Sequence, residues 1–157
     1  MRIYKDLFEF IQLLNKHRVE YLIVGGYAVV AHGYNRFTGD LDVWIKISEE
    51  NADKMMLVTI DYPIPPGIFS REHFLTKGPL KGGQFGNPPL RIDILNDVIG
   101  MQFDECYKNA MKKSIEGEEF LFIDFDDLIK AKNISGRPQD KADVYALEKI
   151  KRRINKK

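Results

Sequence analysis

Two aspartates stand one residue apart in an otherwise apolar stretch, DLDVWI, at residues 40–45. Side chains alternate between the two faces of a β-strand, so Asp40 and Asp42 share one face with Trp44, and the aliphatic residues between them form the other. The two Cα atoms then lie roughly 7 Å apart. Two like charges on a partly buried face are costly unless a cation lies between them. The pattern therefore indicates a cation-binding face, beside which Trp44 is expected to pack.

A second strand-like segment, LRIDIL at residues 90–95, places Asp93 and Arg91 on one face and aliphatic residues on the other. If the two strands are neighbours, three carboxylates converge. Carboxylate oxygens are hard ligands that suit Mg²⁺ or Mn²⁺, and these ions share their ligands with substrate phosphates. We therefore predict a metal site at Asp40, Asp42 and Asp93. The alternative is ordinary ion pairing with basic residues, namely Arg36, Arg91 or Lys46.

A glycine pair precedes the aspartates. Gly25 and Gly26 follow the apolar run YLIV and lead into the segment YAVVAHGY, which is predicted to be helical. A strand, a glycine turn and a helix together present free backbone N–H groups and the positive end of a helix dipole, which suits a phosphate. Alternatively, the glycines only let the helix pack closely on the sheet.

The elements that must position these residues can be predicted from periodicity and caps. Apolar residues at helical spacing between Ile3 and Leu14 predict a first helix, and Ser48 and Asp124 are typical N-caps of later ones. Residues 61–89 are rich in Pro and Gly and predict a long irregular segment with a short strand near 84–86. The remaining predictions are strands at 20–24, 40–47 and 90–95, a short helix and hairpin leading to residue 123, a helix at 124–132, and a last helix with Pro138 in its first turn. We expect an α/β (α+β) fold, with helices packed on a small mixed β-sheet.

Size and composition predict a single domain over residues 1–157 with a basic tail at 149–157. The chain is 44% hydrophobic and 30% charged, and its net charge of +1 provides no overall field for nucleic acid or membrane binding. The single cysteine, Cys106, excludes an internal disulfide and suits a reducing compartment. The sequence has neither a signal peptide nor the ~20-residue apolar run of a membrane span, so we expect a soluble cytoplasmic protein without a membrane partner.

These motifs resemble a known superfamily. The stretch LIVGGYAVVAHGYNRFTGDLDVWI is similar to the signature of the polymerase-beta-type nucleotidyltransferases, and RIDIL resembles their third-carboxylate strand. With DLIKAKNISGRPQDKADV near the end, the pattern resembles minimal bacterial nucleotidyltransferases, including toxin-like enzymes of the abortive-infection class and relatives that adenylylate antibiotics. The resemblance spans about residues 20–147 and implies the nucleotidyltransferase fold.

The resemblance also implies roles for individual residues. Asp40 and Asp42 would ligate two divalent ions, and Asp93 would ligate one of them and act as base or orienter for an attacking hydroxyl. The residues expected to bind the nucleotide are Gly25, Gly26, Arg36, Thr38 and Lys132. Many relatives have Ser at the position of Gly26, so here backbone N–H groups would hold the phosphate.

Alternatives stay open for the basic residues. Arg36 is as well explained by a salt bridge to Asp40 or Asp42, and Arg137 and Asp140 by a capped turn with ion pairing. The tail KIKRRINKK at residues 149–157 either tracks an RNA backbone or is a frayed, solvated end.

The resulting expectation is a metal-dependent nucleotidyltransferase that moves a nucleoside monophosphate from an NTP, such as ATP, to a hydroxyl acceptor. The acceptor is RNA, protein or a small molecule, with RNA favoured by the basic tail, and residues 63–89 are where its specificity would reside. The resemblance leaves open a toxin-like role and an antitoxin-like partner protein. The alternative is a catalytically silent nucleotidyltransferase-fold protein that serves as a binding or regulatory module.

Overall fold

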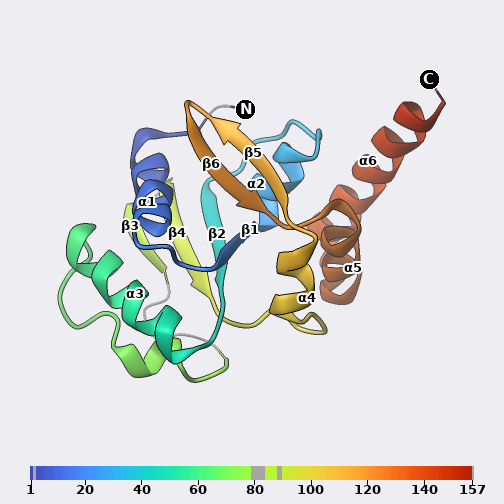
Figure 1. Ribbon diagram of the computed structural model, residues 1–157. Helices are drawn as coiled ribbons and strands as arrows, with labels where there is room; N and C mark the ends of the chain where they lie inside the picture. Colours follow the sequence, from blue (N-terminus) through green and yellow to red (C-terminus); the bar gives the residue numbers. More distant parts are fainter. Residues whose placement is uncertain (2, 79–83, 88–89, 157) are drawn as a thin grey trace.

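The computed structural model describes residues 1, 3–78, 84–87 and 90–156 (Figure 1). Helices and strands alternate over most of this length, and a short 3-10 helix, η1, lies in the Pro- and Gly-rich segment. In chain order the elements are α1 (Lys5–Lys16), β1 (Tyr21–Val24), α2 (Gly25–Ala31), β2 (Asp40–Ile45), α3 (Glu49–Asp61), η1 (Arg71–Phe74), β3 (Gln84–Asn87), β4 (Leu90–Leu95), α4 (Phe103–Lys108), β5 (Met111–Ile115), β6 (Glu118–Phe122), α5 (Phe125–Ser135) and α6 (Pro138–Asn155).

The strands form one mixed sheet in the order β3-β4-β2-β1-β6-β5. β2 pairs in parallel with β4 and antiparallel with β1, and β1 pairs in parallel with β6. The outer strands, β3 and β5, are antiparallel to their neighbours. The predicted class, a small mixed sheet with helices packed on it, is confirmed.

Each face of the sheet is covered by helices. Phe10 of α1 packs edge-on against Phe85 of β3, with ring centroids 5.5 Å apart. Phe85 lies opposite Ile92 of β4, so α1 covers the face that carries the aliphatic residues of β2 and β4. On the other face Phe103 of α4 packs at 5.2 Å and 86° against Trp44. Trp44 is only 2% exposed, which confirms that it packs in the core beyond the carboxylates.

The predicted caps occur where the sequence placed them. The Ser48 hydroxyl accepts a hydrogen bond from the backbone N–H of Asn51 at 3.0 Å, and α3 begins at the next residue. The Asp124 carboxylate accepts a bond from the backbone N–H of Asp126 at 3.0 Å and starts α5. Pro138 occupies the first turn of α6, where its missing N–H costs no hydrogen bond.

Some boundaries differ from the predictions. α2 begins at Gly25, so both glycines lie in the helix, and α5 extends three residues past Lys132. α6 continues to Asn155 and its last turns point away from the sheet (Figure 1), so residues 149–155 are helical and the interpretation as a frayed end is wrong there.

The predicted irregular segment contains η1, and the strand expected near 84–86 is β3. Residues 79–83 and 88–89 of that segment, where acceptor specificity was also expected, and Lys157 of the tail lie outside the described residues. Within the ranges given above, none of the helices combines the length and hydrophobicity needed to cross a lipid bilayer.

Candidate active site

The strands carrying the three aspartates are neighbours, as the metal-site prediction requires. β2 and β4 run parallel, with Asp42 directly opposite Asp93 and Asp40 opposite Arg91. Directly opposed residues on paired strands point to the same side of a sheet. The structure therefore brings together Asp42 and Asp93, which are fifty-one residues apart in the sequence.

The environment of Asp42 disfavours its negative charge. Burial raises the pKa of Asp42 to about 7, and the charge of Asp93 and a hydrogen bond between the two carboxyl groups add to the rise. The charge of Asp40 adds less, and Lys132 opposes the shift. Near neutral pH the Asp42 carboxyl group is therefore stabilised by a proton or by a nearby cation.

Asp40 is turned toward a different partner. Its Oδ1 accepts a hydrogen bond from Arg91 Nε at 3.3 Å, one of the ion pairs that sequence reasoning had left open. In the part of the chain that the structure describes, no three His, Cys, Asp or Glu side chains are arranged to hold a metal ion. Two of the predicted ligands are thus adjacent, and the third would have to leave Arg91 to join them.

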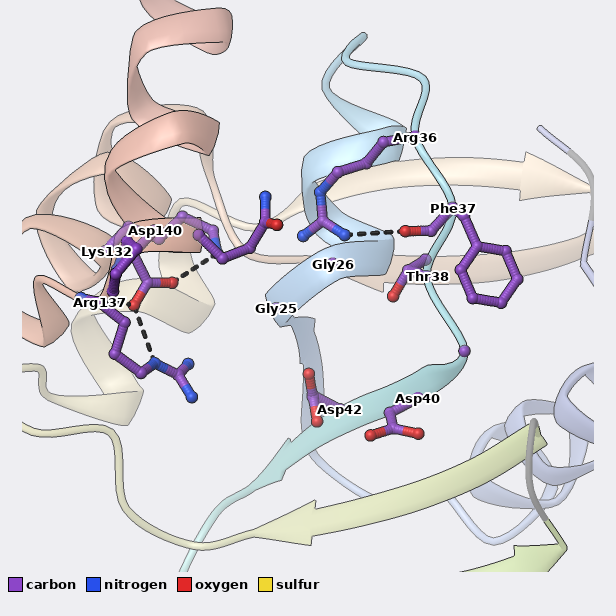
Figure 2. A pocket seen from close by; sticks show the side chains of 13 residues that line it. Gly25, Gly26, Arg36, Phe37, Thr38, Asp40, Asp42, Lys132, Arg137 and Asp140 are labelled. Atoms are coloured by element: carbon purple, nitrogen blue, oxygen red, sulfur yellow. Dashed lines mark hydrogen bonds and ion pairs between the residues drawn. The ribbon is translucent and has the colours of Figure 1, made fainter.

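The glycine pair lies directly above the carboxylates (Figure 2). Gly25 has a φ of +66°, and a Cβ at this position would collide with the Asp42 carboxylate. A Cβ at Gly26 would overlap the side chain of Thr38 and lie 3.3 Å from Nη2 of Arg36. Close packing therefore requires both glycines, as the alternative interpretation proposed, while their use as a phosphate seat stays a prediction.

Arg36 is held by a carboxylate that the sequence prediction did not include. Its Nε and Nη2 donate to the two carboxylate oxygens of Asp143 at 2.8 and 2.9 Å. The expected alternative, a salt bridge to Asp40 or Asp42, is wrong, because α6 brings Asp143 over the loop that carries Arg36. Both the guanidinium and Thr38 still line the cleft next to the glycines.

Lys132 belongs to the same network. Its Nζ lies 3.1 Å from Asp140 Oδ1 and 3.0 Å from Asp143 Oδ2, and its side chain is 9% exposed. Asp143 is fully buried and also accepts a hydrogen bond from Gln139 Nε2 at 2.9 Å. One carboxylate on α6 therefore orients the two cations, Arg36 and Lys132, that the sequence predicts as nucleotide-binding.

Arg137 and Asp140 form the capped turn that the alternative interpretation described. The Asp140 carboxylate accepts bonds from the backbone N–H and from Nε of Arg137, at 3.3 and 3.0 Å. Burial acts to raise the pKa of Asp140, but hydrogen bonds from Ser135, Arg137 and Lys132 outweigh it and hold the pKa at about 2. Asp140 therefore stays ionised and fixes the turn between α5 and α6.

These residues surround one cleft of about 570 Å³. In Figure 2, Asp40 and Asp42 lie on one side of Gly25 and Gly26, and Lys132, Arg137 and Asp140 approach from the helices α5 and α6. An adjoining hollow continues past Asp93, so we call the hollow described here the polar half of the cleft. Among the residues that line it are Gly25, Gly26, Arg36, Thr38, Asp40, Asp42, Lys132 and Arg137.

Sequence reasoning missed Asp143, although a signal was available. Asp140 and Asp143 are three residues apart on a predicted helix, a spacing that puts both on one helical face. A pair of carboxylates on the face that also buries Leu147 indicates cationic partners inside the protein. The identity of those partners depends on how α6 packs, which periodicity alone does not specify.

The sequence matches a protein family over nearly its whole length. A model of the family described as nucleotidyltransferase of unknown function (DUF6036) matches residues 3–155. The chain belongs to this family. The resemblance drawn from the glycine and aspartate motifs is thereby confirmed at the level of a nucleotidyltransferase family.

The fold of this nucleotidyltransferase family member is also found among solved structures. It is similar to a Thermotoga maritima protein provisionally named as a nucleotidyltransferase, with a TM-score of 0.58 and 15% sequence identity. The match covers 96% of this chain and 91% of the other. At this identity the likeness shows the fold alone. No curated protein matches the chain.

Proposed function

We propose that the protein is a metal-dependent nucleotidyltransferase that moves a nucleoside monophosphate from an NTP to a hydroxyl acceptor. The observation that carries this proposal is the pairing of Asp42 with Asp93 directly below the Gly25–Gly26 turn. Membership in a nucleotidyltransferase family supports it.

The triphosphate would occupy the polar half of the cleft. Arg36 and Lys132 provide positive charge there, and the guanidinium is suited to bidentate contact with phosphate oxygens. Gly25 and Gly26 contribute backbone atoms to the lining of the cleft. Asp143 keeps both cations in place, so the site is organised before a ligand arrives.

The donor set fits a hard divalent cation. Asp42 and Asp93 are adjacent carboxylates whose mutual repulsion a cation would remove, and Asp40 supplies a third when it leaves Arg91. When bound, Mg²⁺ or Mn²⁺ would neutralise triphosphate charge and stabilise both the entering and the leaving oxygen of an in-line displacement.

The order of the strands suggests how the reacting groups are arranged. Gly25 and Gly26 directly follow β1, Asp42 lies on β2, and Asp93 lies on β4; these three strands are consecutive in the sheet. The hydroxyl oxygen of the acceptor would form a bond to the α-phosphorus while the bond to the bridging oxygen breaks. Pyrophosphate leaves with the electron pair toward the glycine turn, and the hydroxyl proton passes to Asp93.

A second candidate, a catalytically silent nucleotide-binding module, is favoured by one observation. Arg91 forms an ion pair with Asp40, and among the described residues the three aspartates are not grouped as ligands of one metal ion. In that case the chain would bind NTP without transferring it.

Labelled NTPs with Mg²⁺ and separate RNA, protein and aminoglycoside acceptors test the two candidates. Label transfer to any acceptor supports the enzyme, whereas NTP binding without transfer to any of them supports the module. Asp93→Asn is the key variant, because it keeps the side-chain size and removes a proton acceptor. Transfer should fall by about 10²-fold or more while NTP binding persists. Wild-type transfer in Asp93→Asn would exclude the proposed role of β4.

A further inference from the structure

The cleft has a second half with a different lining. A hollow of about 590 Å³ continues past Asp93 and shares five lining residues with the polar half, namely Gly25, Asp42, Lys132, Arg137 and Asp140. Most of its other lining is aliphatic and comes from the end of β4, the loop after it and α5. The residues that matter here are Leu95, Val98, Ile99, Leu128, Ala131 and Ile134. We call it the aliphatic half of the cleft.

The walls of this half are held in place by the protein itself. The buried Asn96 side chain, next to Leu95, accepts a hydrogen bond from the backbone N–H of Gly78 and donates to the carbonyls of His73 and Thr76. Gly100 lies so close to α5 that a Cβ there would be 2.6 Å from Cδ1 of Ile134. The loop after β4 is thus anchored at both ends.

The mouth of the aliphatic half exposes apolar surface beside charged groups. Ile99 is 75% exposed and Ile134 is 45% exposed, and both line the hollow. An exposed apolar patch that borders a polar cleft is typical of a surface that a ligand covers.

The charges around this half do not suit a phosphate or a polyanion. Three carboxylates, those of Asp93, Asp97 and Asp140, line it in addition to Asp42. Against these four carboxylates the lining has two cations, Lys132 and Arg137, whereas the lining of the polar half has three cations, including Arg36, against three carboxylates. An uncharged group with large apolar faces fits these walls better than an anion does.

We propose that the aliphatic half receives the nucleobase of the NTP. This inference rests on the proposed function, since it assumes that the triphosphate lies in the polar half. Asp42 lines both halves, so an α-phosphate placed over it would leave the phosphates on one side and the nucleoside on the other. Aliphatic walls contact the faces of a base more than its edges, so all four bases should bind, purines more tightly than pyrimidines because they bury more area.

The test compares ATP with tripolyphosphate, which has the same phosphate chain and no nucleoside. Isothermal titration calorimetry with Mg²⁺ should show tighter binding of ATP to the wild-type chain. Ile99→Ser combined with Ile134→Ser should weaken ATP about tenfold and leave tripolyphosphate unchanged, equivalent to ~1.4 kcal/mol of lost apolar contact. Ile60→Ser is the matched control, because Ile60 on α3 is 76% exposed and lies outside both halves; it should change neither affinity.

The outcomes distinguish a failure of the nucleobase assignment from a failure of the proposed nucleotidyltransferase function. If tripolyphosphate does not bind the wild-type chain, the proposed function fails and the inference with it. If tripolyphosphate binds but the variant keeps wild-type ATP affinity, the inference alone is wrong. A raised KM for the acceptor with unchanged ATP affinity would overturn it as well and assign the aliphatic half to the acceptor. Should the double variant melt early, Ile99→Ser alone repeats the test at a position where solvent already surrounds the side chain.

Discussion

Replacing Asp143 by Asn should destabilise the protein far more than breaking a shorter ion pair at its surface. Asp143 is fully buried and lies within 3.0 Å of nitrogens of both Arg36 and Lys132. The substitution keeps the shape of the side chain but removes its charge. Lys132 would retain a carboxylate partner in Asp140, whereas the Arg36 guanidinium would keep uncharged acceptors, among them the backbone carbonyl of Phe37 at 2.9 Å.

The expected magnitude follows from the burial of the cations left behind. Removing one partner of a buried ion pair typically costs ~3–5 kcal/mol, because the other charge stays buried and unpaired. The side chains of Arg36 and Lys132 are 20% and 9% exposed, and Asn still offers a carbonyl oxygen, so we expect the lower end, about 3 kcal/mol. For a chain of this size that loss lowers Tm by roughly 6–12 °C.

Thermal melting and urea denaturation of Asp143→Asn and Asp53→Asn measure the difference. Asp53 pairs with Arg71 at 2.6 Å, a shorter distance, but the two side chains are 65% and 44% exposed. Its loss should cost much less stability than the loss of Asp143, because water screens and replaces the pair. If Asp143→Asn melts within about 2 °C of the wild type, or if both variants lose the same stability, the buried network does not stabilise the fold as described.

Three further predictions concern Gly25, the loss of stability at low pH and the last helix. Gly25→Ala should lower the free energy of unfolding more than Gly117→Ala, because both have positive φ (+66° and +83°) but only Gly25 faces Asp42; equal losses in urea would contradict this. The pKa of Asp140, held at about 2, lies below the ~3.9 of an unfolded Asp, so its contribution to stability is complete above about pH 4 and is lost as pH falls through 2. Asp140→Asn should therefore flatten the fall of Tm across that range, and an unchanged profile would refute the assignment. Ending the chain after Ile150 should leave the Tm of the protein nearly unchanged, since residues 151–156 are exposed. If RNA is the acceptor, the shortened chain should bind RNA more weakly and with a smaller dependence on salt. An unaltered salt slope would exclude the basic end from RNA binding.

Periodicity and caps sufficed for most of the secondary structure because they are local signals. The alternation in DLDVWI predicted both faces of β2, and Ser48 and Asp124 marked the starts of two helices. The same alternation in LRIDIL put Asp93 on the polar face of β4, and pairing with β2 then placed it opposite Asp42. For the carboxylates, sequence pattern and topology agree.

The rest of the candidate site depends on packing between distant segments. The partner of Arg36 proved to be Asp143, 107 residues away, and no local pattern distinguishes it from the nearer Asp40 and Asp42. The aliphatic half of the cleft was likewise invisible in the sequence, because Ile99 and Ile134 belong to separate elements and each alone resembles an ordinary surface isoleucine. Such features arise only when α5 packs near the end of β4.

The link between Arg36 and Asp143 also makes the arrangement of the site depend on the docking of α6. A chain that has formed the sheet and α5 already contains the three aspartates and both glycines, yet its two cleft cations still lack the carboxylate that orients them. Docking of α6 is therefore the event that completes the site, and it closes the longest loop among these contacts. A protease cut at the Gly136–Arg137 junction, or a fluctuation that lifts α6, would leave the sheet in place while Arg36 and Lys132 lose their alignment. If the proposed nucleotide site is right, nucleotide affinity should thus fall when α6 undocks, even while the sheet stays folded.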